Sequence, residues 1–189
     1  EDKVSFIKDI SGLNYRLAGE VIGAANEVVP MILKGGGIKN TLIISPPGAG
    51  KTTMLRDIVR QLSYKSYRVS VVDERSEIAA LCEGRSAFDL GFSTDILEGV
   101  DKAEGMLMVL RSMSPDVIVT DEIGKQSDID AIERITNSGA AVIATIHGRN
   151  IDMIKRRDDL KRMLKFFYLI ITLSKRKGIG TVEEALTEW

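Results

Sequence analysis

The sequence predicts an α/β fold in which a parallel β-sheet is covered by helices on both faces. Short apolar runs without polar alternation, such as those at 41–44 and 117–120, are typical of strands that are buried on both faces. Helical patterns of apolar residues at 54–62, 102–111 and 126–137 lie between such runs. Strands that alternate with helices along the chain are typical of a parallel sheet.

Further apolar runs at 69–73 and 141–146 predict two more strands of this sheet. The segment 76–100 contains several glycines, and we expect it to be irregular. The rest of the chain reads as a basic helical stretch at 150–165, an apolar run at 166–173 and a turn at 178–180.

The N-terminal part differs from the rest in its pattern. A short amphipathic pattern (Val4, Ile7, Ile10) precedes a helical one that starts at Leu17, and Pro30 is expected to interrupt it. The chain starts with glutamate rather than methionine, so we expect this part to be the remnant of a longer N-terminal region. Three glycines at 35–37 mark the break, and the expected division is a helical or linker segment at 1–37 and a main domain at 38–189.

Composition excludes several classes of protein. With 44% hydrophobic and 28% charged residues the chain has the composition of a folded globular protein rather than a disordered one. Its net charge of −1 argues against a surface built entirely for binding phosphates of nucleic acid. The single cysteine, Cys82, excludes an internal disulfide and indicates a reducing, cytosolic setting.

A phosphate-binding loop of the Walker A type follows the first predicted strand and precedes a predicted helix. Its glycines allow backbone N–H groups to converge on an anion at the helix N-terminus. Lys51 would contact the β- and γ-phosphates, and the Thr52 hydroxyl would bind Mg²⁺. Ser45 stands where the usual G-x-x-x-x-G-K-[ST] pattern has its first glycine. The expected nucleotide-binding residues are Pro47, Gly48, Ala49, Gly50, Lys51, Thr52 and Thr53.

Two carboxylates follow the apolar strand at 117–120. Asp121 is expected to bind Mg²⁺, and Glu122 is expected to act as the general base that polarises the attacking water. Residues 121–124 also fit the D-x-x-G pattern of GTPases, but the chain contains no Asn-Lys-x-Asp motif to read guanine. ATP is therefore the expected nucleotide, and water activation suits the acidic pair better than a small-molecule kinase reaction.

Two further strand ends carry candidate residues. His147 follows a strand that should lie beside the phosphate-loop strand, so we expect this histidine to sense the γ-phosphate. The acidic segment 73–77 ends another strand, and its Glu77 could assist the attacking water. No motif places an arginine on the γ-phosphate within one chain, so we expect a neighbouring subunit to supply one. The candidates are Arg75 and Arg85, which are preferred, and Arg111 and Arg149.

Taken together, these motifs resemble those of the stage III sporulation protein AA family. The resemblance rests on five segments and extends from about residue 10 to the end: 45–53, 71–78, 102–115, 119–124 and 145–148. It implies an ATPase of the endospore channel in the mother cell, with a RecA/AAA-like core of the additional-strand class at 38–189. Its broader relatives are the type II and type IV secretion ATPases, whose Asp box and His box resemble 73–77 and 145–147. These relatives imply a hexameric homo-oligomer, with ATP and Mg²⁺ at the subunit boundaries and membrane-embedded channel or export proteins as partners.

The segment 149–177 is strongly basic, with ten lysines or arginines and only three aspartates. It could be a solvated surface, a contact between ring subunits or a contact with an anionic membrane. It also keeps open a nucleic-acid-acting ATPase, although the few aromatic residues give little support for base stacking, so nucleic acid is not the expected partner. A nucleotide switch without hydrolysis is a third option. The expected location is the mother-cell cytoplasm, either free or at the membrane periphery.

Overall fold

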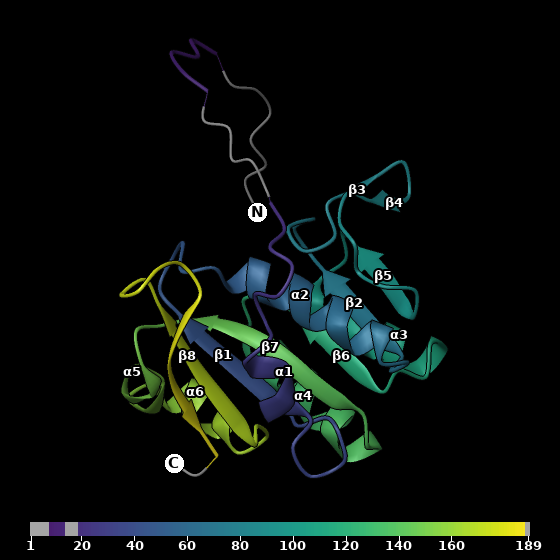
Figure 1. The fold of residues 1–189 in the computed structure, drawn as a ribbon, viewed down its shortest axis with the longest axis vertical. Coiled ribbons are helices and arrows are strands. Elements are labelled where there is room, and N and C mark those ends of the chain that lie inside the picture. The colour runs from purple at the N-terminus through teal and green to yellow at the C-terminus, as the bar shows by residue number, and fades with distance from the viewer. Residues whose placement is uncertain (1–7, 14–18, 188–189) are drawn as a thin grey trace.

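A seven-stranded sheet forms the centre of the computed structural model, which describes residues 8–13 and 19–187 (Figure 1). Adjacent strands are parallel except for the last pair, β8 and β9, which is antiparallel. In sheet order the strands are β5 (Thr94–Glu98), β2 (Val69–Asp73), β6 (Val117–Thr120), β7 (Ala141–His147), β1 (Thr41–Ser45), β8 (Leu169–Ser174) and β9 (Thr181–Leu186). The predicted α/β class is confirmed.

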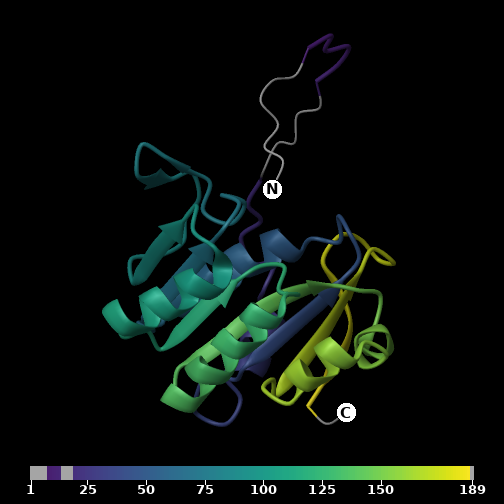
Figure 2. The same ribbon diagram turned by 180° about the vertical axis from the view of Figure 1, so that it is seen from behind.

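Helices cover both faces of the sheet, as Figures 1 and 2 show from opposite sides. Two separate clusters of buried apolar side chains lie between the sheet and these helices. The first cluster contains α1 (Val28–Ile32) and α2 (Lys51–Tyr64). The second contains α3 (Lys102–Ser112), α4 (Gln126–Ser138), α5 (Ile151–Lys155) and α6 (Asp158–Leu164).

The strands lack polar alternation because each of their faces meets a helical layer. In β1, the side chain of Ile43 belongs to the cluster under α2, whereas Leu42 and Ile44 belong to the cluster on the other face. All five residues of β1 are buried. This two-sided burial is the physical reason why a continuous apolar run predicted the strand correctly.

The order of the strands determines where the loops meet. Strand β7 lies between β1 and β6. The prediction that the strand ending at His147 lies beside the strand before the phosphate loop is therefore confirmed. Ser45 at the end of β1 pairs with His147 at the end of β7. Because parallel strands share their carboxyl edge, the loops after β1, β2, β6 and β7 converge there.

Two strands of the seven-stranded sheet are absent from the expectations, and one of them lies in the segment that was expected to be irregular. β5 lies within 76–100 at one edge of the sheet, and β9 lies at the other edge. Both are partly exposed and mix polar with apolar residues, so neither has the apolar run of a central strand. Residues 76–100 also contain a small two-stranded sheet of β3 (Leu81–Cys82) and β4 (Arg85–Ser86).

The expected interruption at Pro30 is wrong, because Pro30 lies inside α1. Proline is tolerated there because the N–H groups of the first helical turn have no partner within the helix. Ala25, Val28 and Ile32 pack into the cluster under α2. Of the earlier patterns, Val4, Ile7 and Leu17 lie outside the described residues. The division at residues 37 and 38 stays a prediction.

Within the part of the chain that the structure describes, no helix combines the length and the apolar character needed to span a membrane.

Candidate functional site

The phosphate loop joins β1 directly to α2. Gly50 lies at the helix N-cap with φ of +91°, and Gly48 has φ of +70°. Both angles lie in the left-handed region, which glycine adopts without the steric cost that a side chain imposes. The first turn of α2 therefore begins at Lys51 with its backbone N–H groups directed toward the loop, as anion binding requires.

A cavity of about 330 Å³ opens beside this loop. Its lining includes nine of the eleven predicted site residues, and Arg75 completes it. Ala49 is buried in the loop and Asp121 is buried below the cavity, so these two do not line it. The lining residues are Pro47, Gly48, Gly50, Lys51, Thr52, Thr53, Arg75, Glu77, Glu122 and His147.

The Glu122 carboxylate is the centre of the polar contacts in this cavity. Its Oε1 accepts a hydrogen bond of 3.0 Å from Lys51 Nζ and lies 2.6 Å from His147 Nε2. Its Oε2 accepts a 2.7 Å hydrogen bond from Arg75 Nη1. Lys51 Nζ is also 3.1 Å from each ring nitrogen of His147. The predicted base, the predicted phosphate-binding lysine and the predicted γ-phosphate sensor therefore lie in direct contact.

These contacts change the acidity of Glu122. Burial raises the pKa of its carboxyl, but the hydrogen bond from Lys51 and the charges of Lys51, His147 and Arg75 together hold that pKa below its usual value. A carboxylate in this state binds protons weakly. It becomes a stronger base only when some of these cations turn to another anion.

The backbone of Glu122 is strained, with φ of +46°. This conformation is uncommon for residues other than glycine and occurs often at functional sites. Two neighbours hold it: the Glu122 N–H donates to Thr145 Oγ1 at 2.9 Å, and the Glu122 carbonyl accepts from Lys102 Nζ at 3.1 Å. Neither Thr145 nor Lys102 was a predicted site residue. A polar residue inside β7 and a lysine at the start of α3 were the available signals.

Arg75 was a preferred candidate for the arginine that a neighbouring subunit supplies, yet it contacts its own chain's Glu122. The reason is the pairing of β2 with β6, which places the loop after β2 beside the end of β6. The order of strands in a sheet depends on pairing between distant segments, so the motifs alone could not predict that β2 lies beside β6. The supply of an arginine by a neighbouring subunit stays a prediction.

The acidic residues at the end of β2 and in the loop after it have different positions: Asp73 stabilises the turn, whereas Glu77 lines the cavity. Asp73 is buried, and its carboxylate accepts backbone N–H groups of Glu77, Ile78 and Ala79 at 2.8–2.9 Å. This is a turn-stabilising arrangement, and it sets the course of the loop that carries Glu77 to the cavity wall. Glu74 lies 3.4 Å from Lys102 Nζ. Only Glu77 of these acidic residues lines the cavity.

Asp121 is 2% exposed and lies under the loop of Glu122. Burial raises the pKa of its carboxyl to about 6, because removal from water disfavours the charged form and the charge of Lys102 offsets this only in part. The carboxylates of Asp73, Glu122 and Glu77 raise that pKa further. A bound cation would favour the ionised form.

Asp121 gives a stability prediction for the chain in chelator. The carboxyl titrates near 3.8 in the unfolded chain and near 6 in the folded one, so the folded state binds the extra proton between these values. The contribution of Asp121 to the free energy of unfolding should therefore fall as pH rises through this window, by on the order of 2–3 kcal/mol between pH 4 and pH 7. Asp121→Asn should remove this fall, as measured by urea unfolding at several pH values. Asp130→Asn, an exposed change on α4, should keep it, and a pH-independent difference between Asp121→Asn and the unaltered chain would contradict the prediction.

The residues present fit a magnesium ion that is shared with phosphate. Thr52 supplies a hydroxyl at the cavity, and Asp121 supplies a buried carboxyl. A cation bound there would lower the raised pKa of Asp121 and stabilise its ionised form. Among the described residues no group of three or more His, Cys, Asp or Glu could hold a metal by itself. This agrees with Mg²⁺ chemistry, in which water and substrate phosphates provide most of the ligands.

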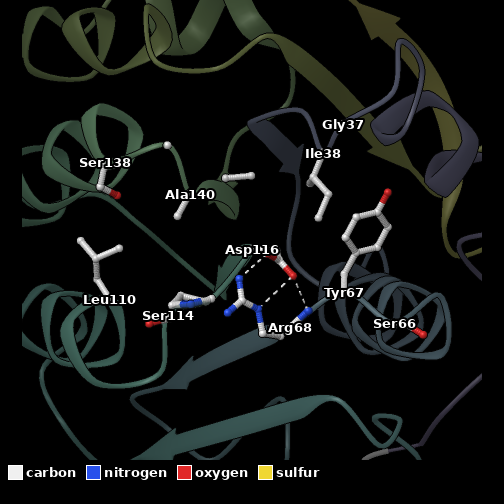
Figure 3. A pocket seen from close by; sticks show the side chains of 13 residues that line it. Gly37, Ile38, Ser66, Tyr67, Arg68, Leu110, Ser114, Asp116, Ser138 and Ala140 are labelled. Atoms are coloured by element: carbon white, nitrogen blue, oxygen red, sulfur yellow. Dashed lines mark hydrogen bonds and ion pairs between the residues drawn. The ribbon is translucent and has the colours of Figure 1, made fainter.

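A larger cavity of about 850 Å³ lies at the opposite, amino-terminal edge of the sheet (Figure 3). At its centre Arg68 Nη2 donates to Asp116 Oδ1 at 2.8 Å, and Asp116 Oδ2 accepts the Arg68 backbone N–H at 2.8 Å. These bonds hold the pKa of Asp116 below its usual value. They join the starts of β2 and β6, and no predicted site residue lies there.

Comparison with known proteins agrees with this arrangement. A family model described as "Sporulation stage III, protein AA" matches residues 1–188. Stage III sporulation protein AA of Bacillus subtilis (strain 168) is 39% identical over 188 residues, which cover 96% of this chain and 61% of that protein. The chain thus spans less than two thirds of the length of this relative.

Two solved structures share the fold at low sequence identity. The VirB11 ATPase of the Brucella suis type IV secretion system, solved with sulphate, has a TM-score of 0.59 and 14% identity, over 86% of this chain and 50% of that one. The pilus retraction motor PilT, solved with ADP, has a TM-score of 0.57 and 19% identity, over 78% and 45%. These likenesses support the P-loop fold class, and the family match identifies the chain more closely: it belongs to the sporulation stage III protein AA family.

Proposed function

We propose that this chain carries the ATP-hydrolysing site of a motor that serves a sporulation-specific channel or secretion apparatus. One observation carries the proposal: Lys51, Glu122 and His147, from three separate strand–loop units, contact one another in the cavity beside the phosphate loop. This is the set of groups that would bind a terminal phosphate and activate water next to it.

The contacts suggest how the site would respond to ATP. Phosphate oxygens compete with Glu122 for Lys51, because both are anionic acceptors for the same ammonium group. When Lys51 turns to the phosphates, the hydrogen bond that most strongly lowers the pKa of Glu122 is lost. Glu122 then becomes a better proton acceptor for the attacking water, and Glu77, which lines the same cavity, would assist. His147, which contacts both Lys51 and Glu122, would contact the terminal phosphate.

Magnesium would be held through the Thr52 hydroxyl and the Asp121 carboxylate. When bound, it would neutralise charge that develops on the phosphates. In this chain Asp121 would need to be ionised for that role, which its pKa of about 6 permits at neutral pH.

The family match and the fold shared with secretion ATPases support a proposal about assembly and partners. We propose a hexameric ring in the mother-cell cytoplasm or at the membrane periphery, working on membrane-embedded proteins of the sporulation apparatus. The basic segment 149–177 supports a charged contact surface: Arg149, Lys155 and Arg156 are exposed, whereas Arg162 pairs with Glu133 at 2.9 Å. A positive surface on an otherwise negative chain suits head-to-tail contact between copies.

Assembly gives a direct test of the ring. Specific ATPase activity should rise with protein concentration, and the mass measured in solution should increase when ATP is present. The reason is that a neighbouring subunit would complete the site with an arginine, a contribution of about 10³-fold or more in related enzymes. Activity per subunit that stays constant on dilution, together with a monomeric mass in ATP, would refute the ring.

Arg85 is the arginine to test in trans. It lies exposed in β4, on the small two-stranded sheet that projects from the body of the fold (Figure 1), whereas Arg75 is occupied by its own chain's Glu122. Arg85→Ala and Lys51→Ala subunits should each be inactive alone and should regain activity when mixed.

A nucleic-acid-acting ATPase, the alternative, would instead show turnover stimulated by added DNA or RNA.

A further inference from the structure

The connection between β8 and β9, residues 175–180, lies directly on the phosphate loop, and we call it the 175–180 hairpin. The Gly180 N–H donates to the Ala49 carbonyl at 3.1 Å. Ile179 Cγ2 is 2.9 Å from the position that a Cβ on Gly50 would occupy. Lys175 Nζ is equally close to the corresponding position on Gly48. In Figures 1 and 2 this yellow connection lies beside the blue loop that precedes α2.

Another cavity, of about 480 Å³ and distinct from the two described above, adjoins this contact. One wall is formed by the end of the 175–180 hairpin and the start of β9, and the other by the turn at 23–27. The lining offers apolar surface from Ala24, Ile179 and Val182 and polar groups from Asn26, Glu27 and Thr181. Ligand pockets of this size and mixed character are typical of small-molecule sites.

One wall of this cavity is hydrogen-bonded to α2, which starts at the phosphate loop, and the other wall is hydrogen-bonded to the loop itself. Asp57 of α2 accepts the Ala25 N–H at 2.8 Å, and Gln61 of α2 donates to Asn26 Oδ1 at 2.9 Å. The opposite wall is tied to the loop through Gly180 and Ala49. The cavity therefore has a fixed position relative to the phosphate site.

The direction of a bound nucleotide follows from the sheet order. Glu122 and His147 follow β6 and β7, which lie on one side of β1, so the terminal phosphate belongs on that side. β8 and β9 lie on the other side of β1. A nucleotide that lies along the loop must therefore direct its ribose and base toward the 175–180 hairpin.

We propose that the cavity between the turn at 23–27 and residues 177–182 holds the base and ribose of the nucleotide whose phosphates bind at 48–53. This inference rests on the phosphate site of the proposed function and adds a second, separate binding region to it. Ile179, which is 74% exposed, supplies apolar surface for the face of the base. Asn26, Glu27 and Thr181 supply hydrogen-bonding groups at the cavity wall.

Comparison of ATP with inorganic tripolyphosphate separates the two regions, because tripolyphosphate has no base or ribose. Dissociation constants for both would be measured by calorimetry in Mg²⁺ buffer. Ile179→Asn removes apolar surface from one wall without adding charge beside the phosphate loop, and Ala24→Phe fills the cavity from the opposite wall. Each should weaken ATP binding about tenfold, which for Ile179→Asn is the scale of one lost apolar contact, and leave tripolyphosphate binding within about twofold.

The matched control is Phe92→Asn, which places the same polar side chain at a residue that is 71% exposed and does not line either cavity. It should leave both constants unchanged, and thermal unfolding would verify that all three variants fold. ATP affinity that is unchanged in both cavity variants, or losses that are equal for ATP and tripolyphosphate, would overturn the inference. Failure of the unaltered chain to bind either compound would instead overturn the proposed function, and the inference with it.

Discussion

Replacement of Lys51 with alanine is expected to abolish ATP turnover and to weaken ATP binding. Lys51 is the one lysine of the phosphate loop, and its Nζ is 3.0 Å from Glu122 and 3.1 Å from His147. Loss of its ammonium removes the cation that would move from Glu122 to the phosphates. Removal of one preorganised donor commonly costs about 10²- to 10³-fold in rate, so turnover should fall at least that far. Steady-state phosphate release and calorimetric ATP binding would measure the two effects.

Two further variants separate charge from packing. Lys51 is 7% exposed, so its aliphatic chain fills space that alanine leaves empty. Lys51→Met keeps most of that volume without the charge, and it should be as inactive as Lys51→Ala. Lys65→Ala, at the exposed far end of the same helix, should turn over normally. Normal rates in the Lys51 variants would show that the nucleotide site lies elsewhere.

The central part of the fold could be predicted because strands that are buried on both faces consist mostly of apolar residues. Strands β1, β2, β6 and β7 are buried on both faces and read as apolar runs. The edge strand β5 contains only Ile96 and Leu97 as apolar residues; Asp95 is exposed and the other four residues are only partly buried. A segment of this kind is stabilised by its pairing with β2, which no local pattern reveals.

The site was predictable to the extent that local motifs determine it. The phosphate loop, Glu122 and His147 each follow a strand, and parallel strands end at one edge, so their meeting followed from the fold class. The contacts of Arg75 and Lys175 depend on which strands are neighbours and on the path of a hairpin. Lys175 carried only one signal, its place in the basic segment.

Glu122→Gln is expected to keep ATP bound and to stop hydrolysis. Glutamine preserves the shape of the side chain but cannot accept the proton of the attacking water, so turnover should fall about 10²- to 10⁴-fold. In the nucleotide-free site its amide nitrogen would face either Lys51 or Arg75, which are both donors only. The variant should therefore release one of these cations. Because Lys51 then interacts more weakly with residue 122, ATP affinity should be unchanged or higher.

Single-turnover measurement separates the two consequences of Glu122→Gln. Radiolabelled ATP should remain uncleaved on the variant while equilibrium binding stays at least as tight as in the unaltered chain. Glu133→Gln, which alters the exposed pair with Arg162, should change neither quantity. Normal single-turnover rates in Glu122→Gln would show that the general base is another residue. Glu77 would then be the next to test, because it lines the same cavity, with Glu74 after it because its carboxylate lies near Lys102.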